Sequence, residues 1–134
     1  MGYCMTQQDS DFFVSAANLP KMVKAIQSLH GNESIRDTSG RHFSWVESDF
    51  FVFNDAERIL QAWRWNGELD GEGNINAIYF EGEKLGDDNV LFDAIAPFVK
   101  AGSFIEMRGE DGERWRWCFD GKTMVEKQAI IEWR

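Results

Sequence analysis

The sequence has few of the residues from which metal centres, disulfide networks and nucleophile–base pairs are built. It contains two cysteines, Cys4 and Cys118, and two histidines, His30 and His42. The cysteines match no motif spacing, and neither histidine has a cysteine, a second histidine or a carboxylate at ligand spacing. No nucleophile elbow or Walker loop occurs. We therefore expect no bound metal, no cofactor and no enzymatic activity.

Long apolar runs are also missing. No apolar stretch approaches the length of a membrane span. Residues 1–9 have neither the basic segment nor the apolar core of a signal peptide. We therefore expect a cytoplasmic protein with no membrane association.

Positive charge is scarce, with 14 lysines and arginines against 23 acidic residues and a net charge of −9. Nucleic-acid-binding proteins usually carry a basic patch, so this balance opposes direct binding of nucleic acid. Two interpretations of the acidity remain open. The charge keeps the domain soluble, or it forms a surface that meets a basic partner by presenting carboxylates where a nucleic acid presents phosphates.

Aromatic residues, in contrast, are abundant, with 6 tryptophans and 11 phenylalanines. The length of 134 residues fits one domain, 1–134, that can bury a core without metals or disulfides. No internal repeat, low-complexity tract or linker divides the chain. We expect a monomer or a homodimer.

Alternating residues and tight turns predict a three-stranded antiparallel meander over 103–131, with strands at 103–108, 114–119 and 123–131. A left-handed Gly112 closes the first turn, and Asp120-Gly121 predicts a type I′ turn. The resulting register pairs Ile105 with Trp117, Met107 with Trp115, and Glu106 with Arg116.

The last strand of the meander carries a conflict. Strict register places Met124, Glu126 and Gln128 on the face of the two tryptophans, and this placement would bury a charge. A bulge near Val125 would restore an apolar face.

Helical spacing occurs three times before the meander. The first helix is expected between Asn18 and Gly31. The second is expected from a capping box at Asn54 to Trp63. The third is expected from Asp87 or Asp88 to Gly102, with a kink or an early end at Pro97.

Strands and loops complete the pattern. A first short strand is expected at 11–15 after a polar leader, and a hairpin at 65–80 around residues 70–73. Residues 42–46 fit a short strand, residues 50–53 fit a strand or a buried loop, and residues 31–41 form the segment that we expect to be most mobile.

This order predicts an α+β fold with two to three helices on one face of an antiparallel sheet of five to six strands. Its first part has the β-α-β-β-α-β order of a ferredoxin-like core, and the C-terminal β-meander extends it.

Short segments spread over nearly the whole chain form a distinctive combination. They are Gly2-Tyr-Cys-Met5, Phe43-Ser-Trp45, Ala62-Trp-Arg-Trp65, Gly82-Glu-Lys-Leu-Gly-Asp87, Ala94-Ile-Ala-Pro97, Ser103-Phe-Ile-Glu-Met107 and the hairpin from Gly109-Glu-Asp-Gly112 to Trp115-Arg-Trp117. This combination resembles a family of small hypothetical proteins from bacteria and their phages, and is distantly similar to ferredoxin-like domains of plasmids and phages. The resemblance implies a mobile-element context and no particular activity.

Arginines form the first candidate site. Arg64, Arg108, Arg114 and Arg116 are expected to share the outer side of the sheet with Glu106. Cross-strand charge pairing on a solvated face is one interpretation, and binding of a small anion or of a partner's carboxylates is the other.

The loop 82–88 is the second candidate, because two glycines and Lys84 precede a helix start at Asp87 and Asp88. Its carboxylates oppose phosphate binding, so an ordinary strand-to-helix connection is favoured. Trp115 and Trp117 are expected to face the helices; exposed tryptophans would instead form a partner hot spot.

These observations lead to ranked hypotheses. The first is a non-enzymatic interaction module of bacterial or phage origin that binds a host protein, such as a basic nucleic-acid-binding protein, through an acidic surface, in the manner of an anti-defence or anti-CRISPR inhibitor. The alternative is a small-ligand or nucleotide-binding domain that uses the arginine-bearing sheet face. An enzyme ranks third, with Glu106 or the pair Asp87 and Asp88 as acid or base.

Overall fold

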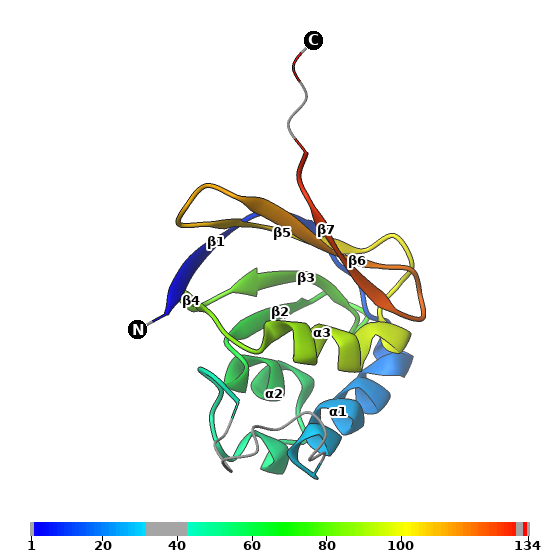
Figure 1. Cartoon of the computed structure of the whole chain (residues 1–134). Helices are drawn as coiled ribbons and strands as arrows, with labels where there is room; N and C mark the ends of the chain where they lie inside the picture. Colours follow the sequence, from blue (N-terminus) through cyan, green and yellow to red (C-terminus); the bar gives the residue numbers. More distant parts are fainter. Residues whose placement is uncertain (1, 32–42, 131–132, 134) are drawn as a thin grey trace.

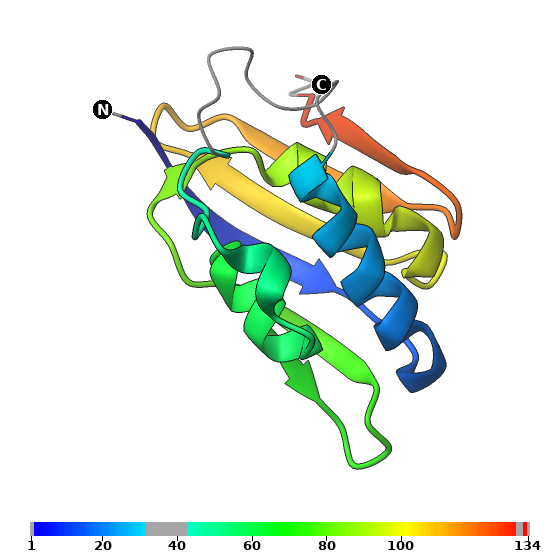
Figure 2. The ribbon, with the colours of Figure 1, turned by 90° about the horizontal axis from the view of Figure 1, so that it is seen from below.

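The computed structural model describes residues 2–31, 43–130 and 133. The strands are β1 (Tyr3–Asp11), β2 (Trp65–Leu69), β3 (Ile75–Phe80), β4 (Lys84–Leu85), β5 (Phe104–Gly109), β6 (Arg114–Phe119) and β7 (Met124–Gln128), and the helices are α1 (Leu19–Ser28), α2 (Ala56–Ala62) and α3 (Asp88–Ile95). An antiparallel five-stranded sheet, in the order β4-β1-β5-β6-β7, curls over a separate two-stranded sheet, β2-β3 (Figure 1). The three helices lie on one side of the larger sheet (Figure 2). The predicted α+β class is confirmed.

The first hairpin of the meander has the predicted register. Ile105 pairs with Trp117, and Met107 pairs with Trp115. Gly112 closes the turn with a φ of 90°. The alternation and the turn residue act over short sequence distances, so local physics was sufficient to predict this hairpin.

The second turn differs from the predicted type I′ turn. Phe119 pairs with Met124, so residues 120–123 form the loop. Gly121 has a φ of 94°, and the Asp120 carboxylate accepts hydrogen bonds from the backbone N–H groups of Lys122 and Thr123. These hydrogen bonds lower the pKa of Asp120 below its usual value. The aspartate thus closes a longer loop through its side chain instead of adopting a positive φ.

The strand β7 resolves the charge conflict without a bulge. Its pairing with β6 is regular, with Glu126 opposite Trp117 and Gln128 opposite Trp115. Both polar residues therefore lie on the tryptophan side, as strict register predicts. They remain exposed because β7 is the edge of the sheet.

The prediction for the first strand is wrong. β1 runs from Tyr3 to Asp11 and includes the supposed polar leader, whereas residues 12–15 form only a bridge at Val14. β1 pairs with β4 on one side and with β5 on the other, and its register shifts between Gln7 and Asp9. Main-chain hydrogen bonds to β4 and β5 hold this strand inside the sheet. Because these bonds do not depend on side chains, the strand can form with little alternation of apolar and polar residues.

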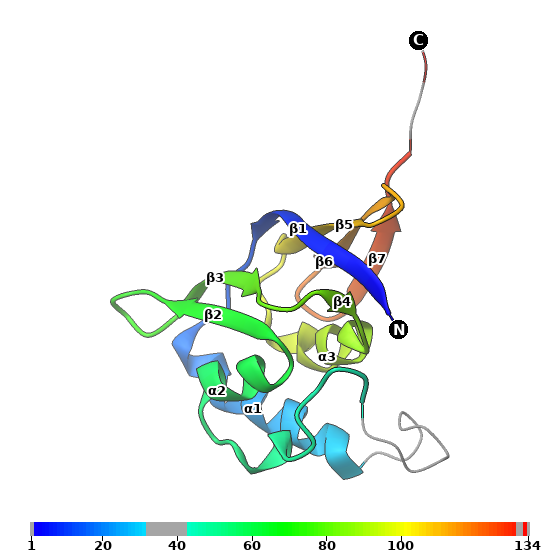
Figure 3. The same ribbon diagram turned by 90° about the vertical axis from the view of Figure 1, so that its left-hand side faces the viewer.

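The ferredoxin-like order is not confirmed, because the β2-β3 hairpin forms its own sheet beside β1 (Figure 3). Two features join β3 to β1 and to the residues that follow it. One is the bridge between Val14 and Ile75. The other is the Gln7 side chain, which donates from Nε2 to the Ile78 carbonyl (2.8 Å) and accepts at Oε1 from the Phe80 N–H (2.8 Å). The Gln7 amide thus takes the place of a peptide group in a strand ladder.

Replacing Gln7 with alanine is expected to lower the free energy of unfolding by about 2 kcal/mol, because two backbone groups of β3 lose their partner in a part-buried place. Denaturant unfolding measures the loss. Gln8→Ala is the matched control, since the exposed Gln8 amide makes only one long contact of 3.4 Å, to the Gln7 carbonyl. Equal stabilities of the two variants would contradict the role of Gln7.

All three helices occur where they were predicted, with differences at their ends. The α2 N-cap is Asp55, which accepts from the Arg58 N–H at 3.0 Å, so the predicted capping box at Asn54 is wrong by one residue. The α3 helix stops at Ile95, and a 3-10 turn containing Pro97 follows. This ending agrees with the expected shortening at proline.

The segments between α1 and α2 contain no strand in their described part. Residues 43–46 form a turn, and Phe50–Val52 form a 3-10 helix. Residues 32–42 lie outside the described residues, and they include nearly all of the segment 31–41 that was expected to be most mobile. Every helix among the described residues falls short of the length and apolarity that a membrane crossing requires.

The core lies between the curled sheet and the helices and is built around aromatic rings. The Phe92 ring of α3 packs 4.9 Å from Trp117 and 5.0 Å from Trp65, measured between ring centroids. All three side chains are fully buried. Trp117 therefore faces the helices, as expected, and the neighbouring Trp115 is also buried.

Candidate functional site

Four of the seven predicted site residues lie together on the outer face of the sheet. Glu106 accepts a hydrogen bond from Arg116 Nε at 2.8 Å, and its second oxygen lies 3.8 Å from Arg114 Nη1. The hydrogen bond to Glu106 raises the pKa of Arg116. Arg108 lies opposite Arg114, and Lys127 of β7 lies opposite Arg116. We call Glu106, Arg108, Arg114, Arg116 and Lys127 the arginine face.

Arg64 does not belong to this face, so that part of the prediction is wrong. It follows α2 with a φ of 72°, and its side chain is only 14% exposed. Its Nη2 atom donates to both oxygens of the fully buried Asp88 carboxylate at 2.9 and 3.0 Å, and its Nη1 atom donates to the Lys84 carbonyl. The left-handed turn at Arg64 directs the guanidinium inward, and no sequence periodicity indicated this conformation.

The Asp88 carboxylate forms the centre of a buried cluster. It accepts from Trp65 Nε1 at 2.9 Å and from the Gly86 N–H at 2.9 Å, in addition to Arg64. Asp87 is the α3 N-cap residue, and its carboxylate accepts from the Ser44 N–H at 2.7 Å. The two aspartate carboxylates of the loop 82–88 therefore accept hydrogen bonds from within the protein.

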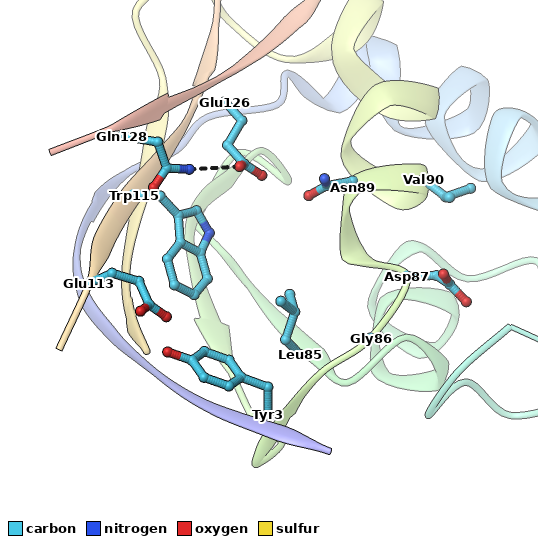
Figure 4. Close-up of a pocket in the computed structure, with 10 residues that line it drawn as sticks. All are labelled: Tyr3, Leu85, Gly86, Asp87, Asn89, Val90, Glu113, Trp115, Glu126 and Gln128. Carbon is cyan, nitrogen blue, oxygen red and sulfur yellow. Dashed lines mark hydrogen bonds between the residues drawn. The ribbon is translucent and has the colours of Figure 1, made fainter. Parts of the chain in front are cut away.

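A pocket of about 390 Å³ opens between this loop and the sheet (Figure 4). Its apolar lining comes from Tyr3, Leu85, Val90 and Trp115. Its polar lining comes from side chains of Asn89, Glu113, Glu126 and Gln128. Asp87 also borders the pocket, but in Figure 4 its carboxylate points away from the cavity. We call this cavity the acidic pocket.

Two carboxylates flank the Trp115 indole in the acidic pocket, Glu126 on one side and Glu113 on the other (Figure 4). Gln128 Nε2 donates to Glu126 at 2.9 Å and holds that side chain over the opening. Asn89 Oδ1 accepts from Trp117 Nε1 at 2.7 Å, which ties α3 to β6 at the inner end. The residues that line this pocket include no lysine, arginine or histidine.

Gly109 shapes the pocket wall. A Cβ atom at this position would lie 2.2 Å from Glu113 Oε1 and 2.3 Å from the Tyr3 hydroxyl. The Tyr3 hydroxyl accepts from the Asp111 N–H at 3.1 Å. The absence of a side chain at Gly109 therefore allows Tyr3 and Glu113 to lie against β5.

This arrangement suits a positively charged group. Carboxylates supply counter-charge, and aromatic rings attract cations through their π faces. Sequence reasoning did not select Tyr3, Glu113 or Glu126 as site residues. The one available signal was the placement of Glu126 on the tryptophan face, which had been interpreted as a conflict of register.

Other chemistry-bearing groups are few. Cys4 and Cys118 are free thiols. Lys84 Nζ lies 3.0 Å from Cys4 Sγ, and this contact raises the pKa of Lys84. No three histidine, cysteine or acidic side chains gather at a possible metal position within the described ranges.

Comparison with protein-family models, with curated proteins and with solved structures finds no match to this chain. The resemblance to small phage and bacterial proteins therefore stays a prediction.

Proposed function

We propose that this chain is a non-enzymatic interaction module that binds a basic segment of a partner protein. In this proposal a lysine or arginine side chain of the partner enters the acidic pocket, between Glu113 and Glu126. The observation that carries the proposal is the lining itself, which combines two carboxylates with Trp115 and Tyr3 and has no cationic side chain.

The size of the pocket supports a side chain as the ligand. A volume of about 390 Å³ lies at the lower end of the range typical of small-ligand sites. A long flexible cation can place its charged end beside the carboxylates while its methylene groups contact Leu85, whose side chain points into the cavity (Figure 4). Tryptophan and tyrosine are also the residues that most often dominate binding energy at interfaces.

The net charge of −9 supports a basic partner, because long-range attraction accelerates encounter with a positively charged surface. The specific form of the proposal is a cytoplasmic inhibitor, encoded by a bacterium, phage or mobile element, that covers the nucleic-acid site of a host defence protein.

Binding of a short basic peptide tests the proposal. Acetyl-Gly-Arg-Gly-amide and its lysine counterpart are expected to shift the indole N–H resonance of Trp115 in a ¹⁵N-correlated NMR spectrum. The glutamine counterpart is expected to leave the resonance unchanged, because it carries no charge. Added salt should weaken the effect.

The double variant Glu113→Gln/Glu126→Gln is expected to reduce the affinity about tenfold, the equivalent of one strong charged contact. Glu68→Gln/Glu72→Gln changes the net charge equally at the exposed end of the β2-β3 hairpin, away from the pocket, and should retain the affinity. Equal losses in both variants would show that only net charge matters, and the proposed pocket would then be rejected.

A further inference from the structure

The arginine face is positively charged, whereas the molecule as a whole is negatively charged. It carries four cationic side chains in a protein of net charge −9. We infer that this face is a binding site for a multiply charged oxyanion of the pyrophosphate class. Trp115 and Gln128 border both this site and the acidic pocket, but its cationic side chains line this site alone, and the inference does not rest on the proposed function.

Cross-strand register is the first observation. Arg108 lies directly opposite Arg114, and in the neighbouring row Arg116 lies directly opposite Lys127. Like charges at directly opposed positions destabilise a sheet. Two such pairs in adjacent rows therefore create a repulsion that a bound anion would relieve.

The supply of internal counter-charge is the second observation. Glu106 bonds to Arg116 through Nε alone, and its distance of 3.8 Å from Arg114 is too long for a hydrogen bond. Asp9 is the other carboxylate that acts on Arg116. The side chains of Arg108 and Lys127 form no hydrogen bond or ion pair with any residue that the structure describes.

Four cations and two carboxylates leave an excess of two positive charges, so an anion with at least two negative charges completes the balance. Guanidinium groups present paired N–H donors that match phosphate oxygens. The Nη atoms of Arg116 and most donors of Arg114 remain available for this purpose, with Arg116 held in place by Glu106 and by the Phe104 ring, 4.3 Å from its Cζ atom.

A shallow pocket on the arginine face provides a place where the anion can bind. A cavity of about 230 Å³ lies over the junction of β6 and β7, and its lining consists of Glu106, Arg114, Trp115, Arg116, Lys127, Gln128 and Ala129. The Arg114 side chain is 52% exposed, so its guanidinium is accessible to a ligand. Glu106 lies at the base, where it orients Arg116, and its charge disfavours ligands that bring only one negative charge.

Titration with inorganic pyrophosphate at constant ionic strength tests the inference. We expect saturable shifts of the Arg114 and Arg116 side-chain Nε–H resonances, and no such shifts with acetate at equal ionic strength. Pyrophosphate should also raise the melting temperature, because a ligand that binds only the folded state stabilises it.

Arg114→Gln/Lys127→Gln should weaken pyrophosphate binding about tenfold or more. Lys21→Gln/Lys24→Gln removes two exposed charges from α1 and should bind as the unmodified protein does. Equal weakening in the two variants would overturn the inference. The absence of saturable shifts would also overturn it.

Discussion

Replacing Asp88 with asparagine is expected to lower the free energy of unfolding by about 3 kcal/mol, the size typical of breaking a buried ion pair from one side. The carboxylate is fully buried and accepts from Arg64, Trp65 and Gly86. Asparagine keeps the shape but removes the charge, so the Arg64 guanidinium stays inside without a counter-ion. The side-chain NH₂ group of asparagine is a hydrogen-bond donor, and it would face the N–H donors that surround the Asp88 carboxylate.

Denaturant unfolding of Asp88→Asn against the unmodified protein measures this effect. Glu47→Gln is the control, because it breaks an exposed arginine–carboxylate pair with a short contact, between Arg58 and Glu47, whose side chains are 39% and 45% exposed. Exposed pairs contribute little, so the control should be much less destabilised.

A double-mutant cycle separates the ion pair from the rest of the cluster. Arg64→Met in the Asp88→Asn background is expected to recover part of the lost stability, because the unpaired cation is gone. A loss for Asp88→Asn no larger than that of the Glu47 variant would contradict the assigned role of the buried pair.

Replacing Gly109 with alanine is expected to weaken binding of the arginine peptide about tenfold, while the free energy of unfolding falls by only about 1 kcal/mol. The added methyl group meets Glu113 Oε1 and the Tyr3 ring, both at the ends of side chains that can rotate. They must move away from β5, so the wall of the acidic pocket changes while the strand pairing remains.

Peptide titration and denaturant unfolding of the same sample check both halves of this prediction. Gly71→Ala is the control, since a Cβ atom there has nothing within 4 Å. Unchanged peptide affinity in Gly109→Ala would show that Tyr3 and Glu113 do not contribute to binding. A large loss of stability instead would show that the side chains cannot rotate away.

Local patterns in the sequence were sufficient for much of the fold. The β5-β6 register, the helices and the α+β class follow from alternation, helical spacing and turn residues. The position of β1 could not be predicted in this way. Its partners β4 and β5 lie about 80 to 100 residues away, and backbone pairing places few demands on side chains.

The candidate sites were predictable only in part. Glu106, Arg108, Arg114 and Arg116 share a face because alternation on two paired strands places them there. Arg64 was placed on the wrong side of the sheet and the burial of Asp88 was not predicted, because a left-handed turn and a buried carboxylate leave no periodic signal. Tyr3 and Glu126, from opposite ends of the chain, both line the acidic pocket.

The sequence by itself determined which segments alternate as strands, which residues form turns and which aromatic residues are available for the core, since these properties depend on near neighbours. The tertiary structure decided where β1 inserts, that the β2-β3 hairpin leaves the main sheet, and that β7 ends as an exposed edge. Because β7 is an edge strand, Glu126 stays exposed to solvent although it lies on the same side of the sheet as Trp115. The two residues therefore line the acidic pocket together, at the position where the sequence alone indicated a conflict of register. Long-range packing brings such distant side chains together, and no local pattern encodes it.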